Sequence, residues 1–183
     1  MASLYEYYDT GADTNSALGV GNQLGQTFTP SIAHSAYSFK ALLFRVGSPG
    51  VVTCSYYATS VGGVTDGLPT GGVLSSGTLN GNDFTDNSAG IFYEFIMPTA
   101  PNLSNNTKYA AVIKAPNGIW ATNIVRWLAD ETLPAYSGGS SLDSSDGGVS
   151  WNGVNGKDFL FEDWGNPISS ASAGNGINFG INF

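Results

Sequence analysis

The sequence IFYEFIM, residues 91–97, carries the clearest signal of the fold. Every side chain in it is apolar or aromatic except Glu94, so both faces of an extended segment would need cover. A short run that is apolar on both faces is typical of a strand in the middle of a sheet. We therefore expect residues 91–97 to form a central strand and to be among the most buried segments of the molecule.

Outward from this run, apolar and polar residues alternate in further segments, with Gly, Pro, Asn and Ser clustered between them. Alternation with a period of two is typical of strands, whereas helical periodicity is nearly absent. The sequence GSPG at 47–50 predicts a tight turn, and the glycine-rich residues 62–72 predict a long exposed loop. The strands that we expect span residues 4–8, 23–29, 37–46, 51–59, 73–79, 91–97, 108–115, 119–127 and 157–162. The pattern predicts an all-β protein, an antiparallel two-sheet β-sandwich.

Length and charge narrow the class of protein. The 183 residues suit one domain over residues 1–183, with a core that needs neither metal nor disulfide. Charged residues make up 11% of the chain, the formal net charge is −8, and the six basic residues are scattered, so a nucleic-acid partner is not expected. No apolar stretch approaches the roughly 20 residues of a membrane span, and residues 1–6 lack the pattern of a signal peptide. This combination suits a phage virion protein, which is assembled in the cytoplasm.

Residues 176–183, with the sequence GINFGINF, repeat a four-residue unit. In an extended segment, Ile177, Phe179, Ile181 and Phe183 would all lie on one face and the Gly and Asn residues on the other. Such a strand needs a sheet to cover it, either in its own chain or in a neighbour. We expect it to serve as an assembly strand.

Few residues are candidates for catalysis. His34 is the only histidine, neither a G-x-S-x-G nor an H-E-x-x-H motif occurs, and the lone Cys54 is expected to be a small hydrophobe inside a strand. Paired carboxylates are the remaining option, because glycoside hydrolysis needs two acids across a cleft. The acids that we consider are Glu94, Asp130, Glu131, Asp158, Glu162 and Asp163. Nothing in the sequence fixes their separation, and we expect a protein that is not an enzyme.

The most specific local motif is SSDGGVSW at residues 144–151. It resembles the Asp-box pattern S-x-D-x-G-x-T-W, with Ser150 in place of Thr. An Asp-box is a hairpin in which the carboxylate accepts hydrogen bonds from the turn, Gly adopts a positive φ and the aromatic ring tucks under the hairpin. We expect Ser144, Asp146, Gly148 and Trp151 to have this structural role. No cofactor is expected. The spacing D-x-x-D-G does not match an EF-hand loop, so a structural calcium ion stays an open alternative without assigned ligands.

Aromatic residues make up 13% of the chain. Trp and Tyr in or beside loops can stack on the apolar face of a sugar ring, whereas core packing is the commoner fate. The candidates for ligand binding are Trp120, Trp127, Tyr136 and Trp151.

Across almost its whole length the chain resembles a jelly-roll-like β-sandwich of phage and of surface-exposed bacterial proteins. The matching elements are GQTFT at 25–29, SPG at 48–50, SGTL at 76–79, TKYA at 107–110, YSGG at 136–139 and the hairpin at 146–151. The resemblance implies a non-catalytic structural protein of the virion surface, a capsid decoration or tail component that forms homo-oligomers or docks on other virion proteins. The alternative is a carbohydrate-binding module of a secreted or surface protein, with glycans as partners. Either function implies a location at the virion surface or outside the cell, with neither membrane nor nucleic acid as a partner.

Overall fold

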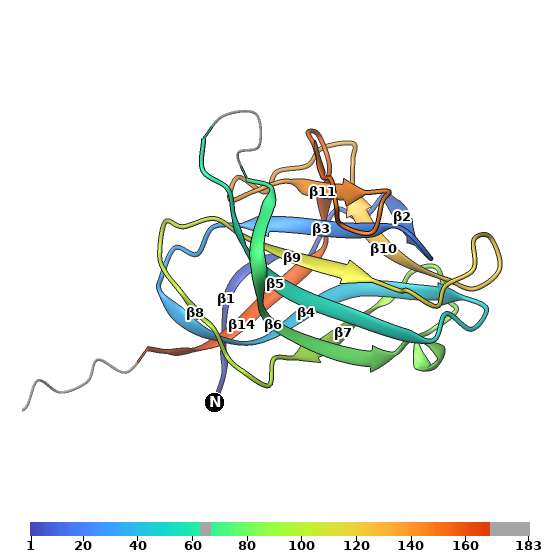
Figure 1. Ribbon diagram of the computed structural model, residues 1–183, viewed down its shortest axis with the longest axis horizontal. Helices are drawn as coiled ribbons and strands as arrows, with labels where there is room; N and C mark the ends of the chain where they lie inside the picture. Colours follow the sequence, from blue (N-terminus) through green and yellow to red (C-terminus); the bar gives the residue numbers. More distant parts are fainter. Residues whose placement is uncertain (63–66, 169–183) are drawn as a thin grey trace, which may run out of the picture.

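The computed structural model describes residues 1–62 and 67–168, which form two antiparallel β-sheets packed face to face (Figure 1). The expected all-β sandwich is therefore confirmed. Within these residues the one helical element is a single 3₁₀ turn, η2 (Gly81–Asp83), and no helix is long and apolar enough to cross a membrane.

The first sheet, sheet A, is built around its longest strand, β4 (His34–Val46). On one side of β4, β14 (Phe161–Pro167) and β10 (Ile124–Asp130) pair with it end to end. On the other side lie β7 (Ile91–Ile96) and β8 (Asn102–Leu103). The remaining strands pair with β14 or β10 and are β1 (Ser3–Tyr8), β2 (Thr14–Leu18) and β13 (Asp158–Phe159).

The second sheet, sheet B, has the strand order β12-β11-β3-β9-β5-β6. Its strands are β3 (Gln23–Phe28), β5 (Val51–Thr59), β6 (Pro69–Asn80), β9 (Tyr109–Lys114), β11 (Ser141–Ser144) and β12 (Asn152–Val154). Strands that follow one another in sequence often lie in different sheets, so the chain crosses the core repeatedly.

Aromatic rings fill the space between the sheets. Phe39 of β4 and Phe161 of β14 stack with their ring centroids 5.5 Å apart, and the Trp127 ring lies 4.4 Å from that of Phe159. From sheet B, Phe28 and Tyr56 meet these rings, and both are fully buried. Offset and edge-to-face contacts of this kind add to the stabilisation that burial alone provides.

Most expected strands are present, but the position of residues 91–97 is wrong. These residues form β7, which pairs with β4 alone, and Ile91 and Ile96 are 52% and 43% exposed. The central position belongs to β4, because its thirteen residues are long enough to pair with β14 and β10 on one side and β7 on the other.

One strand boundary and four additional strands also differ from the expectation. Residues 119–123 form a tight turn closed by an Ile119–Asn123 bridge, with Ala121 at φ 68°, so the strand expected at 119–127 begins only at Ile124. The strands β2, β8, β11 and β12 were not expected. The expected assembly strand at 176–183, with Ile177, Phe179, Ile181 and Phe183, lies outside the described residues.

Candidate functional site

The motif at residues 144–151 forms the turn between β11 and β12. The Asp146 carboxylate accepts hydrogen bonds from the Ser150 amide at 2.9 Å and from the Ser144 hydroxyl at 2.8 Å, and Ser144 Oγ accepts one from the Gly148 amide. Gly148 has a φ of 93°, which a residue with a side chain rarely adopts. Hydrogen bonds from the Ser150 hydroxyl and amide, and then from Ser144, lower the pKa of Asp146 to about 2. The turn is therefore held by an ionised carboxylate.

Trp151, directly after this turn, lies half-buried on the outer face of sheet B. Its ring packs against an apolar patch formed by Ala110 and Val112 of β9 and Leu142 of β11. Tyr57 of β5 packs against the same patch. The hydrogen-bonded turn on one side and the apolar patch beneath fix the orientation of the Trp151 ring.

Three shallow hollows meet at Trp151, with volumes of about 300, 370 and 380 Å³. Tyr57, Gln23 and Thr70 line the first, and the Gln23 side chain is held there by its hydrogen bond to the Gly147 carbonyl. Asn152 and Asn155 line the second, and Ser60, Thr70 and Val149 line the third. We call Trp151 together with the residues lining these hollows the Trp151 surface.

The Trp151 surface has the chemistry of a site for a neutral polar ligand. Its side chains offer two aromatic rings, several hydroxyl groups and three carboxamides, and Lys108 is the one charged residue among the described residues that line the hollows. An aromatic ring with neutral donors and acceptors around it suits a sugar, whose ring has an apolar face and a rim of hydroxyl groups.

The four aromatic residues considered as ligand contacts do not form one platform. Trp127 is 0% exposed and donates from Nε1 to the Leu160 carbonyl at 3.0 Å, so its ring belongs to the core and cannot meet a ligand. Trp120 is 50% exposed in the turn before β10. Tyr136 packs edge-on against Phe161 between the layers. Of the four, only Trp151 lies beside a hollow on sheet B.

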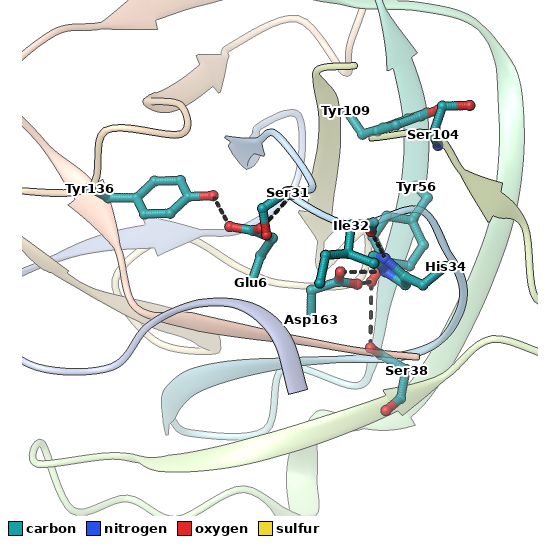
Figure 2. A network of polar contacts seen from close by, with 10 residues as sticks. All are labelled: Glu6, Ser31, Ile32, His34, Ser38, Tyr56, Ser104, Tyr109, Tyr136 and Asp163. Atoms are coloured by element: carbon teal, nitrogen blue, oxygen red, sulfur yellow. Dashed lines mark hydrogen bonds and ion pairs between the residues drawn. The ribbon is translucent and has the colours of Figure 1, made fainter. Parts of the chain in front are cut away.

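A second group of polar residues lies inside the sandwich (Figure 2). His34 begins β4, Asp163 lies in β14 and Tyr56 in β5, and all three side chains are 0% exposed. His34 Nε2 is 2.8 Å from Asp163 Oδ2, and the Tyr56 hydroxyl donates to Asp163 Oδ1 at 2.5 Å. His34 Nδ1 lies 3.0 Å from the Ile32 carbonyl, and the Tyr5 ring stacks on the imidazole at 3.9 Å. This group, the buried network, ties the two sheets together.

The pKa values in the buried network are shifted by two opposing causes. Burial alone would lower the pKa of His34, but the Asp163 carboxylate beside it outweighs burial and raises that pKa above its ordinary value. The pKa of Asp163 is raised, because burial outweighs the bonds from His34 and Tyr56. Burial and the Asp163 charge also raise the pKa of Tyr56 well above its ordinary value. The His34–Asp163 pair therefore holds its proton tightly.

The histidine and carboxylate of the buried network are residue types found in catalytic triads, but a substrate cannot reach them. No atom of His34, Tyr56 or Asp163 reaches the surface, and a catalytic group must touch its substrate. We therefore assign the buried network to stability.

The other acids considered as catalytic pairs are also held by the fold. Asp130 accepts from the Tyr8 hydroxyl and the Leu133 amide, and Asp158 accepts from the Gln26 carboxamide and the Tyr136 amide. These bonds anchor the loop between β10 and β11. On the outer face of sheet A, Ser38 donates to Glu94 and Trp164 donates to Glu162. Lys157, directly before β13, lies 3.9 Å from Glu131, directly after β10.

The part of the chain that the structure describes contains no group of three or more His, Cys, Asp or Glu residues placed to hold a metal ion. A structural calcium ion therefore has no assigned ligands in this part of the chain.

Sequence reasoning found Trp151 but missed its neighbours and the buried network. Tyr57 and Gln23 meet Trp151 because β5, β9, β3 and β11 lie side by side in sheet B, which no local pattern reveals. The side chains of His34 and Asp163 meet because β14 pairs with β4, in a register that places His34 opposite Pro167 and Asp163 opposite Phe39. The sequence contains one signal: Tyr56 and Asp163 each follow an apolar residue by two positions, Cys54 and Phe161, and so share a strand face with it.

Comparison with known proteins does not assign the chain to a family. No protein-family model matches the chain, and no curated protein matches it.

Proposed function

We propose that this protein is a non-catalytic binding module and that the Trp151 surface binds a neutral carbohydrate. The observation that carries the proposal is the position of Trp151, a ring held from below by Ala110, Val112 and Leu142 and bordered by three hollows with hydroxyl and carboxamide linings.

The rigidity of the ring supports binding energetically. Association orders the side chains at an interface, at a cost of about 0.5–1.5 kcal/mol for each side chain with many rotamers. Trp151 is already positioned by the Asp146 turn and the apolar patch, and Gln23 by its bond to Gly147. A ligand that meets these groups therefore loses little affinity to their ordering.

A glycan array with the purified protein tests the proposal, with Trp151→Ala as the variant and Trp120→Ala as its control. Both substitutions remove one indole from the surface, but only Trp151 borders the hollows. We expect glycan signals with the wild-type protein and the Trp120→Ala variant, and their loss with Trp151→Ala. An array without signals, or signals that survive in the Trp151→Ala variant, would overturn the proposal.

A second candidate function, a structural component of a phage particle, is favoured by the outer face of sheet A. Leu4, Trp164, Ser38 and Ile96 form one cross-strand row there, and Leu4 and Ile96 are both exposed. The exposed Tyr7 belongs to the next row. An exposed apolar patch with charged neighbours is typical of a protein–protein contact.

Sedimentation velocity over a concentration series tests this candidate. We expect the wild-type protein to self-associate or to bind capsids or tails, and the Ile96→Lys variant to do so more weakly. A wild-type protein that stays monomeric and ignores phage particles would contradict it.

A further inference from the structure

The three hollows at the Trp151 surface adjoin one another through shared lining residues, and we call them together the trough. The first and third hollows share Pro69 and Thr70, the second and third share Leu68, and Trp151 borders all three. Gln23 and Tyr57 line the first hollow of the trough, Asn152 and Asn155 line the second, and the Trp151 ring borders both.

This shape indicates which part of a glycan the trough fits. A site for a single terminal sugar needs polar groups that converge on one unit. Here the carboxamides of Gln23 and Asn155 line different hollows that have only Trp151 in common, so we expect that one sugar unit on the ring does not contact both. Each hollow has a volume at the lower end of the roughly 300–1,000 Å³ that small-molecule sites occupy. The hollows together therefore suit several linked units.

We infer that the Trp151 surface binds an internal stretch of a neutral glycan chain, with one sugar unit on the Trp151 ring and neighbouring units in the flanking hollows. This inference rests on the proposed function, because it specifies the ligand of the same surface.

The charge near the trough sets the preference for a neutral chain. The protein has a formal net charge of −8, and the ionised Asp146 lies in the turn whose residues Gly148 and Ser150 line the hollows. Lys108 lines one hollow only. Carboxylated or sulfated chains are therefore repelled over most of the trough, and the repulsion is strongest at low ionic strength.

Isothermal titration calorimetry tests the inference with neutral gluco-, xylo-, manno- and chito-oligosaccharides of one to six units. For the series that binds, we expect the affinity to rise at least tenfold between one and three units and then to level off. The variants Tyr57→Ala and Asn155→Ala should each reduce the gain in affinity with chain length. Asn155 is exposed, so its variant gives a result even if Tyr57→Ala fails to fold.

The outcomes separate the inference from the proposed function. Equal affinities for one unit and for six, abolished by Trp151→Ala, would overturn the extended-chain inference and leave glycan binding intact. Equal or tighter binding of a carboxylated series would overturn the preference for a neutral chain. If none of the four series binds and the glycan array also has no signals, both the inference and the proposed function fail.

Discussion

Replacing Asp163 by asparagine tests the role of the buried network. The carboxamide keeps the shape of the carboxylate and can still accept from the Tyr56 hydroxyl and donate to a neutral His34. What it loses is the negative charge. The substitution therefore separates the contribution of charge from that of packing.

The expected loss of stability in Asp163→Asn follows from the two contacts of Asp163, the 2.8 Å contact with His34 and the 2.5 Å hydrogen bond from Tyr56. A hydrogen bond to a charged group contributes about 1.5–3 kcal/mol net and a neutral one about 0.5–1.5 kcal/mol, so each contact loses about 1 kcal/mol. We expect Asp163→Asn to lower the free energy of unfolding by about 2 kcal/mol, or the Tm by about 4–8 °C for a chain of this length. Asp163→Ala leaves both partners buried and unpaired and should cost about 3–5 kcal/mol.

The pH dependence of the free energy of unfolding shows whether His34 is protonated in the folded protein. The raised pKa of His34 means that its contribution is fully present below the unfolded value of about 6.5 and is lost as the pH rises through the folded value. The raised pKa of Asp163 acts in the same direction. In Asp163→Asn the two largest causes that raise the pKa of His34 are gone, and burial, the largest single cause, is opposed only by the smaller effects of the Ile32 carbonyl and the Glu6 charge. The variant therefore lacks most of the stability that the wild-type protein gains when His34 is protonated. The difference between wild type and variant should therefore shrink from pH 6 to pH 9.

Urea unfolding followed by tryptophan fluorescence, at several pH values, measures both effects. The control is Asp83→Asn, because Asp83 is exposed and should change the stability by less than about 0.5 kcal/mol. A loss below about 0.5 kcal/mol in Asp163→Ala, or a difference between wild type and Asp163→Asn that grows with pH, would refute the assignment.

Three further predictions concern the turn and the core. The pKa of Asp146 is lowered to about 2, so its contribution to the free energy of unfolding is present above the unfolded pKa of about 3.9 and is lost as the pH falls through 2. Asp146→Asn should therefore remove this dependence on acid pH and speed amide hydrogen exchange at Ser150. Unchanged exchange at Ser150 would contradict the prediction. Trp127→Ala should cost about 3–5 kcal/mol in urea unfolding, whereas Trp120→Ala should cost less than about 1 kcal/mol, and equal losses would show that Trp127 is not in the core. Cys54 is fully buried and burial raises its pKa, so iodoacetamide should label it only after unfolding, and rapid labelling of the native protein would be the contrary result.

Local sequence patterns predicted the strands but not their neighbours. In β5, alternation places Val52, Cys54 and Tyr56 toward the core and Tyr57 on the outer face, which agrees with the strand expected at 51–59 and with the place expected for Cys54 inside a strand. For β7 the pattern of apolar residues predicted the strand but not its position, because the position of a strand in its sheet depends on which segments pair with it. Register over long sequence separations is set by the whole core and leaves no local signature.

In the candidate site, too, the local features could be predicted from the sequence and the features that depend on strand pairing could not. The turn at Asp146 depends on residues within a few positions of one another, so its motif is legible in the sequence. The Trp151 surface and the buried network instead join residues from different strands, as with Gln23 beside Gly147 and His34 beside Asp163. Their chemistry becomes visible only when the strand pairing is known.

The most direct test of glycan binding at the Trp151 surface uses the indole N–H signals of the four tryptophans in ¹⁵N–¹H NMR spectra. The signals are assigned by single substitution, and the protein is titrated with the neutral oligosaccharide that gives the strongest signal on the array. The account predicts that the Trp151 signal shifts with saturation, while the signals of the buried Trp127 and of Trp120, which lines none of the three hollows, stay in place. A Trp151 signal that does not move while the oligosaccharide binds elsewhere would contradict it.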